Sequence, residues 1–185
     1  MDKREEKTIN AIHSAFSKLI NEKDYDDITI QDILDISKVS RSTFYAHYKT
    51  KDELLISISN HIFEHVFSHS LQEERTHDFS KDEFYDYRSL ISHIFYHVKD
   101  EKDLFIGILS NKTNALFLLE LRKHISKLVN SYFNNYPYRD LLFPLELRKD
   151  LAVESFIVVL NYWVKSNFLI TPEEIADLYI KSILQ

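Results

Sequence analysis

Chain breakers are almost absent from this sequence. Its 185 residues include one glycine, three prolines and no cysteine. Tight hairpins and glycine-rich phosphate loops depend on glycine and proline, so the composition favours long helices. Hydrophobic residues make up 44% of the chain and charged residues 28%, as in a globular protein. Without cysteine, disulfides and thiolate metal sites are excluded, which fits a reducing cytoplasm.

Apolar residues recur at helical spacing, and no segment alternates with the period of a strand. The first apolar stripe predicts a helix over about 5–21. Capping residues predict short helices over about 29–36 and 41–47, and a longer one over about 51–69. The same signals predict further helices over about 80–98, 104–109, 114–133, 147–168 and 172–184. The expected fold class is therefore all-α, with about nine helices.

Two of the predicted short helices are separated by the turn Ser37-Lys38-Val39 and follow a longer helix. This order is typical of a helix-turn-helix DNA-binding domain, whose second short helix enters a major groove. Ile33, Leu34 and Phe44 would be buried between the helices. The second helix begins with an arginine and small hydroxyl residues, which suit contact with base edges.

The charge distribution singles out the same region. The net charge of −6 argues against nucleic acid when taken alone, but residues 1–51 hold nine basic and nine acidic residues. Within them, residues 38–51 contain Lys38, Arg41, Lys49 and Lys51 and no acidic residue. A local basic stretch on an acidic protein is expected for a phosphate-binding edge. A solvated basic loop would have the same composition, so charge alone leaves both interpretations open.

The segment ITIQDILDISKVSRSTFYAHYKTKDELL, residues 28–55, resembles the N-terminal signature of TetR-type transcriptional regulators over its whole length. The resemblance implies that Phe44 and Tyr48 are packing residues and that DNA is contacted by Thr29, Ser40, Arg41, Ser42, Thr43, Tyr45, His47 and Lys51. The family usually has Ala-Gly where this chain has Ser37-Lys38. We expect Lys38 to adopt the left-handed turn conformation all the same, at roughly 1–2 kcal/mol.

The resemblance also implies the domain organisation. Residues 1–50 would form the DNA-binding domain, with the helix-turn-helix motif at about 28–47, and would continue into a linking helix, 51–69. Residues 70–185 would form a regulatory and dimerisation domain. The family's C-terminal helices usually enclose an effector cavity, for which the expected ligand contacts are Phe67, Phe95, Phe105, Phe117 and Tyr162. The last two helices would pair with a second copy through Phe156, Leu160, Trp163, Ile175 and Leu178.

Nine histidines raise the possibility of a metal site. His61, His65 and His69 follow one another at four-residue spacing, as do His93 and His97. Imidazoles one helical turn apart can chelate zinc or nickel. No carboxylate–histidine set has the order of a known metalloenzyme, so no metal site is assigned. The sequence also lacks a nucleophile elbow, a glycine-rich phosphate loop and a cysteine nucleophile. We therefore expect neither an enzyme nor a cofactor.

The function that these features favour is sequence-specific DNA binding by a homodimeric transcriptional repressor. A small-molecule effector would release the protein from a palindromic operator. The alternatives are an activator of the same family and a metal-responsive regulator that uses the helical histidines. A purely structural helical adaptor would leave the basic stretch unexplained. The charged N-terminal segment and the lack of about 20 consecutive apolar residues predict a cytoplasmic protein without a membrane partner.

Overall fold

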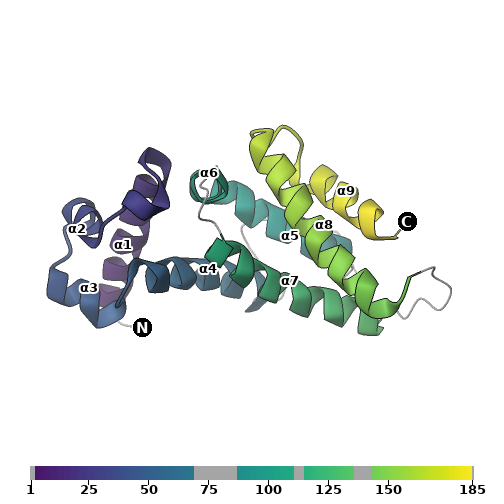
Figure 1. The fold of residues 1–185 in the computed structure, drawn as a ribbon, viewed down its shortest axis with the longest axis horizontal. Coiled ribbons are helices and arrows are strands. Elements are labelled where there is room, and N and C mark those ends of the chain that lie inside the picture. The colour runs from purple at the N-terminus through teal and green to yellow at the C-terminus, as the bar shows by residue number, and fades with distance from the viewer. Residues whose placement is uncertain (1–2, 69–86, 111–114, 136–142, 185) are drawn as a thin grey trace. The chain divides into compact units, whose positions relative to one another are not determined.

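The computed structural model describes residues 3–68, 87–110, 115–135 and 143–184, which form helices and short connections (Figure 1). The elements, in chain order, are α1 (Lys3–Glu22), η1 (Tyr25–Asp27), α2 (Ile30–Ser37), α3 (Arg41–His47), α4 (Lys51–Ser68), α5 (Tyr87–Asp100), α6 (Lys102–Ser110), α7 (Ala115–Asn135), α8 (Leu145–Lys165) and α9 (Pro172–Leu184). No strand occurs among the described residues. The all-α prediction is confirmed. The predicted start of a helix near residue 80 lies outside the described residues.

Capping interactions fix where several helices begin. At α2, the Thr29 hydroxyl accepts from the Asp32 amide at 3.2 Å, and the Thr29 amide donates to the Asp32 carboxylate at 2.8 Å. The same reciprocal pair joins Thr171 and Glu174 at α9. Both boxes satisfy amides that the first helical turn leaves unpaired. They lie where the sequence predicts a helix to begin.

The segment Thr50-Lys51-Asp52-Glu53 has the spacing of a capping box, and the start of α4 differs from that box in one detail. The Thr50 hydroxyl accepts from the Glu53 amide at 3.1 Å. The Glu53 carboxylate, however, accepts from the amide of Lys49 at 2.7 Å, one residue before the capping residue. The carboxylate therefore also fixes the connection that leaves α3.

Lys38 ends α2 in the left-handed conformation, with φ 59° and ψ 20°. Its amide donates to the carbonyl of Leu34 at 2.9 Å, which closes the last turn of the helix. The expectation that a lysine would adopt this conformation is confirmed. The helix-turn-helix geometry is thus kept without glycine, although a side chain at positive φ is disfavoured.

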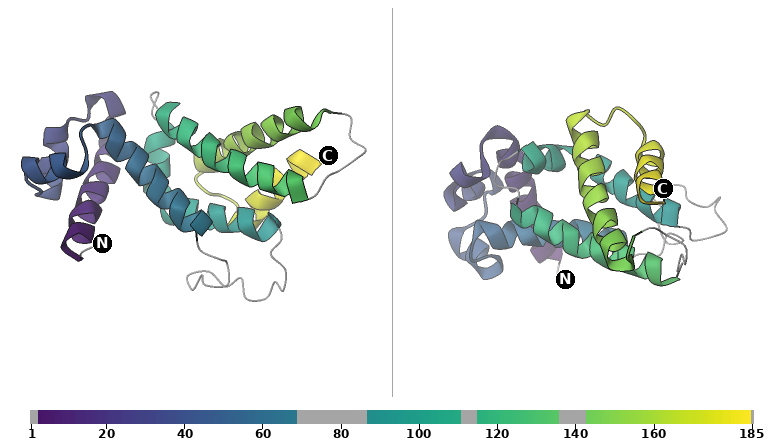
Figure 2. Two further views of the ribbon diagram at one scale, coloured as in Figure 1. Left: turned by 90° about the horizontal axis from the view of Figure 1, so that it is seen from below. Right: turned by 45° about the vertical axis from the view of Figure 1, so that its right-hand side comes forward.

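The chain divides into two compact units whose bounds differ from the expected domains. The first contains residues 1–61 and 101–117, and the second contains residues 62–100 and 118–185. In the first unit, α1, α2, α3 and the first turns of α4 are joined by α6, a helix that we expected in the C-terminal domain (Figure 2). The chain passes between the units inside α4, between α5 and α6, and inside α7.

Gly107, the chain's one glycine, explains why α6 belongs to the first unit. It is buried against the end of α1, where an added Cβ atom would lie 2.6 Å from Ile20 Cγ2 and 3.0 Å from the Ile20 carbonyl oxygen. Only a residue without a side chain allows the two helix backbones to approach this closely.

The second unit has an aromatic core between α5, α8 and α9. Phe95 stacks on Phe156 with ring centroids 5.2 Å apart and meets Trp163 edge-on at 5.3 Å. Tyr179 of α9 contacts Phe156 at 5.3 Å, and α8 and α9 lie side by side. The Trp163 indole donates to the carbonyl of Ile170 at 2.9 Å, which fixes the connection between these helices. None of the described helices is long and apolar enough to cross a membrane.

Candidate nucleic-acid interface

α3 is a seven-residue helix held by a single buried side chain near its middle. Phe44 has no exposed surface and packs on Tyr48, the residue after α3, at 5.8 Å between ring centroids. On the other side, Arg41, Ser42 and Tyr45 are exposed, and Thr43 and His47 are half-buried. The helix contains no acidic residue. Its exposed face is therefore polar and carries neutral and basic groups but no acidic ones.

A cluster of hydroxyl groups marks the N-terminus of α3. Ser40 caps the helix, because its hydroxyl accepts from the Thr43 amide at 3.1 Å. The same oxygen lies 3.0 Å from the Ser42 hydroxyl and 2.7 Å from the Thr43 hydroxyl. Each hydroxyl can both donate and accept, so the cluster can bind phosphate oxygens or base edges.

Thr29 is exposed at the start of α2 but is engaged in the capping box. Its hydroxyl also donates to the Asp32 carboxylate at 2.7 Å, and Lys23 forms an ion pair with the same carboxylate at 2.8 Å. The bonds from Lys23 and Thr29 hold the pKa of Asp32 well below its usual range. The structure thus gives Thr29 a capping role, and a phosphate contact remains a proposal.

Lys51 makes contacts within the chain that the sequence did not predict. Its ammonium group donates to the carbonyl oxygens of Tyr25, Asp26 and Ile28 at 2.6, 3.1 and 3.1 Å, and lies 4.5 Å from the Tyr25 ring centroid. A lysine has three N–H donors, and here all three are used. The Tyr25 hydroxyl in turn donates to Asp52. Lys51 therefore fixes η1 to the start of α4, and a phosphate contact by this residue stays a proposal.

A buried polar network beneath α3 was missed by the sequence analysis. The Tyr48 hydroxyl lies 3.1 Å from His13 Nε2 and 3.3 Å from the Ser57 hydroxyl, so it connects α1, the end of α3 and α4. Burial, and secondarily the charge of His61, lower the pKa of His13 to about 4. The available signal was the position of His13 on the apolar stripe of α1, four residues after Ile9.

Three of the residues expected to bind an effector lie in the cores of the two units. Phe95, Phe105 and Phe117 are all buried in cores, and the last two pack edge-to-face at 5.6 Å in the first unit, whereas Phe95 belongs to the second. Tyr162 is 57% exposed. The side chain of Phe67 lies outside the described residues. The described aromatic side chains pack between helices, and their contact with an effector stays a prediction.

A groove does occur in the first unit, between the end of α1 and α6. It has a volume of about 450 Å³ and is lined by residues that include Ile20, Lys23, Gly107 and Ser110. None of the expected effector contacts lies in it.

The expected dimer contacts also need correction. Phe156, Leu160, Trp163 and Ile175 have no exposed surface within a single chain, so they cannot contact a second copy directly. Leu178 is 47% exposed and stays available. α8 is apolar on more than one face, and the spacing alone does not show which face is buried in the chain's own core.

The histidines of α5 form a close pair. His93 Nε2 and His97 Nε2 lie 2.9 Å apart. His61 contacts the ring of His13 at 6.0 Å, while the side chains of His65 and His69 lie outside the described residues. Across the part of the chain that the structure describes, no three histidine, cysteine or acidic side chains gather as metal ligands.

The half-buried His13 predicts a pH-dependent stability. Unfolded His13 has an ordinary pKa near 6.5, whereas the folded pKa is about 4. The unfolded state binds the proton first, so the free energy of unfolding should fall by up to about 3 kcal/mol as the pH drops from 6.5 to 4. His13→Gln, which keeps a polar contact for Tyr48 but does not titrate, should lose this part of the dependence in urea unfolding. An identical slope in both proteins would contradict the assignment.

Two family models match the chain. The model described as bacterial regulatory proteins of the tetR family matches residues 12–58, and that described as the C-terminal region of a transcriptional regulator matches residues 85–185. The uncharacterized HTH-type transcriptional regulator YuxN of Bacillus subtilis (strain 168) is 26% identical over 180 residues, which are 90% of this chain and 58% of that protein. The chain thus spans little more than half the length of this relative.

Solved structures give the same result. The TetR transcriptional regulator from Streptococcus agalactiae 2603V is 28% identical, with a TM-score of 0.74 over 100% of this chain and 97% of the other. Thermus thermophilus FadR, a TetR family repressor solved in complex with lauroyl-CoA, shares the fold, with a TM-score of 0.54, 17% identity and coverage of 95% and 93%. These proteins are regulators of transcription rather than enzymes. Because one family model covers the DNA-binding helices and the other more than half of the chain, this protein belongs to the TetR family of transcriptional regulators.

Proposed function

We propose that the protein is a dimeric repressor that binds a palindromic operator through α3 and is released by a small-molecule effector. The observation that carries the proposal is the exposed face of α3, which contains Arg41, Ser42 and Tyr45. Phe44, on the opposite side of the helix, is fully buried and anchors it. The N-terminal residues of such a helix lie nearest the base edges when it enters a major groove about 12 Å wide.

The contacts divide into two kinds by side-chain chemistry. Arg41 and the Ser40–Ser42–Thr43 hydroxyls lie at the start of α3, where they would reach base edges. Thr29, Tyr45 and His47 flank this group and would contact the phosphate backbone or bases. Lys51 acts indirectly, since it fixes η1 beside α4 and so supports the start of α2.

Base specificity should depend on Arg41. For the duplex that the wild type selects from a random pool, Arg41→Ala should reduce discrimination at one symmetric pair of positions by roughly 1–3 kcal/mol, because an arginine–guanine contact is lost. Lys127→Ala, which removes an exposed charge from α7, is the matched control. Binding competition with single-base variants measures the effect. Equal weakening on operator and random DNA would show that Arg41 does not read a base.

The dimer would form through an exposed apolar stripe on α8. Leu147, Leu151, Val158 and Tyr162 recur at four- and seven-residue spacing on one face of the helix, with 44–66% of each side chain exposed. Exposed apolar residues of this size mark interaction surfaces. Exposed Glu154, which pairs with Arg122, lies between Leu151 and Val158 on the same face. Exposed Leu178 on the neighbouring α9 would extend the interface. Twofold pairing would then place two α3 helices about 34–36 Å apart, the spacing of successive major grooves.

A charge in the middle of this stripe should dissociate the dimer. Val158→Glu places a carboxylate in the proposed interface, so the protein should sediment as a monomer with unchanged helical content. Its operator affinity should fall roughly 100-fold or more, because the two half-sites are no longer bound together. Ser131→Glu adds the same charge to an exposed site on α7 and should leave the dimer intact. A dimeric Val158→Glu protein would place the interface elsewhere.

Effector control would act through the connections between the units. The chain passes between them inside α4, between α5 and α6 and inside α7, and α6 packs on α1 at Gly107 within the first unit. An effector that binds one arrangement of these helices better than another would shift the population of DNA-binding protein. The FadR complex with lauroyl-CoA supports an effector of small-molecule type.

The Gly107 contact provides a test of this route. Gly107→Ala should force α6 away from Ile20. Such overpacking typically lowers the free energy of unfolding by about 1–3 kcal/mol. The variant should still fold and dimerise but bind the operator more weakly. Adding Ile20→Leu removes the Cγ2 atom that the new methyl group meets and should restore part of the affinity. Titration of the operator with the single and double variants measures both effects. Wild-type affinity in Gly107→Ala would exclude α6 from the control of DNA binding.

A further inference from the structure

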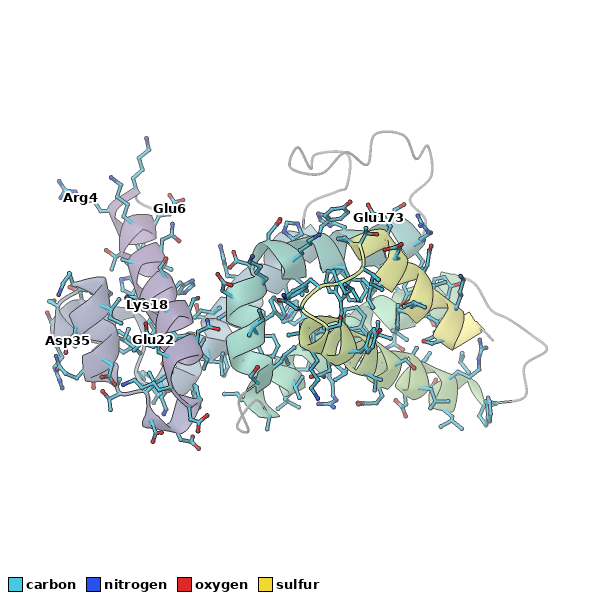
Figure 3. The ribbon with its side chains drawn as sticks, turned by 90° about the horizontal axis from the view of Figure 1, so that it is seen from above. Arg4, Glu6, Lys18, Glu22, Asp35 and Glu173 are labelled. Carbon is cyan, nitrogen blue, oxygen red and sulfur yellow. The ribbon has the colours of Figure 1, made fainter. Side chains whose placement is uncertain are left out.

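The side-chain amide of Gln31 on α2 lies between two charged groups. Arg41 Nη2 donates to Gln31 Oε1 at 2.7 Å, and Gln31 Nε2 donates to Asp35 Oδ1 at 2.8 Å. Gln31 and Asp35 are one helical turn apart, and Asp35 extends from α2 at the surface of the first unit (Figure 3). The three side chains thus form a chain of hydrogen bonds from the first residue of α3 to α2.

The two partners determine the orientation of the Gln31 amide. One end of an amide accepts hydrogen bonds and the other end donates them. A rotated amide would direct its N–H groups at the arginine donors and its oxygen at the Asp35 carboxylate, so both bonds would be lost. Because both partners are charged, the bonds are of the stronger, charge-assisted kind. Gln31 therefore offers its oxygen to Arg41 in a fixed direction.

This contact restricts Arg41 without neutralising it. An exposed arginine otherwise samples many rotamers, and that freedom is lost when it binds a base. The guanidinium group has five N–H donors in a rigid plane, and Gln31 engages only one nitrogen in this contact. Because Gln31 is neutral, the arginine keeps its full charge for DNA. A carboxylate at the same position would form an ion pair with Arg41 instead.

We infer that Gln31 is a positioning residue that sets the plane of the Arg41 guanidinium and thereby determines base specificity at the position Arg41 reads. Recognition of guanine requires two donors of one guanidinium to align with O6 and N7 in the major groove. A hydrogen bond from α2 that fixes this plane favours the aligned geometry before DNA binds. The inference rests on the proposed function, because it presupposes that Arg41 contacts a base.

The test compares base preference among full-length variants on the duplex that the wild type selects. Arg41→Ala should abolish a base preference of roughly 5- to 150-fold, the range for a good bidentate contact. At the same base position, Gln31→Ala should reduce the preference at least about threefold. Preferences at other positions and affinity for random DNA should not change. Asn21→Ala removes an exposed amide from α1, where it donates to the Ser17 carbonyl, and should leave every ratio unchanged.

Variants of Asp35 separate positioning from charge. Asp35→Ala removes the acceptor that orients Gln31 and should reduce the preference at the same position. Asp35→Asn keeps an acceptor oxygen while removing the charge, so it should retain the preference. Thermal melting of each variant should match the wild type, because all three side chains are exposed.

The outcomes distinguish this inference from the function on which it rests. A wild-type protein that prefers no base at any position would refute the proposed function itself. If Arg41→Ala loses a preference that Gln31→Ala retains in full, the function stands and the positioning role of Gln31 is refuted. Loss of preference at every position in Gln31→Ala would also refute it, since that result indicates a general change in α3.

Discussion

The burial of Phe44 is the interaction on which the DNA-facing surface depends. A helix as short as α3, with seven residues, has no stability of its own in water, because nucleation outweighs the few hydrogen bonds it forms. Its geometry therefore comes from packing, and Phe44 is the residue of α3 that is fully buried. The Ser40 cap and the buried Tyr48 hold the two ends. Because the helix is fixed in this way, its exposed residues are not needed for its stability and can serve recognition alone.

The polar groups around this anchor support it through contacts within the chain. Tyr48 is tied to His13 and Ser57, and Lys51 is tied to three carbonyl oxygens at η1. Each of these groups is half-buried or buried, so an unmet hydrogen bond there would be unfavourable. The basic charge of residues 38–51 is consequently smaller in effect than its composition indicates. Lys51 contributes to rigidity, and Lys38 and Arg41 stay exposed.

The sequence predicts most of the fold because its signals are local. Capping at Thr29, Ser40 and Thr171, and the left-handed Lys38, depend on residues a few positions apart. Its errors concern contacts between distant segments. Helical spacing showed that Phe156 and Trp163 lie on apolar faces, but not that these faces meet α5 within the same chain. The role of Lys51 was missed for the same reason, since its partners lie more than 20 residues earlier.

α1 contacts both the support of α3 and α6. Near its middle, His13 contacts Tyr48 at the end of α3, and at its C-terminal end Ile20 lies against Gly107 of α6. A helix with its apolar stripe buried moves as a rigid body more readily than it bends, because its backbone hydrogen bonds and packing resist local distortion. A displacement of α6 at Gly107 would therefore be carried along α1 to the support of α3. Since the chain has a single glycine, placed at this contact, the close approach of α1 and α6 is a specific requirement of the sequence.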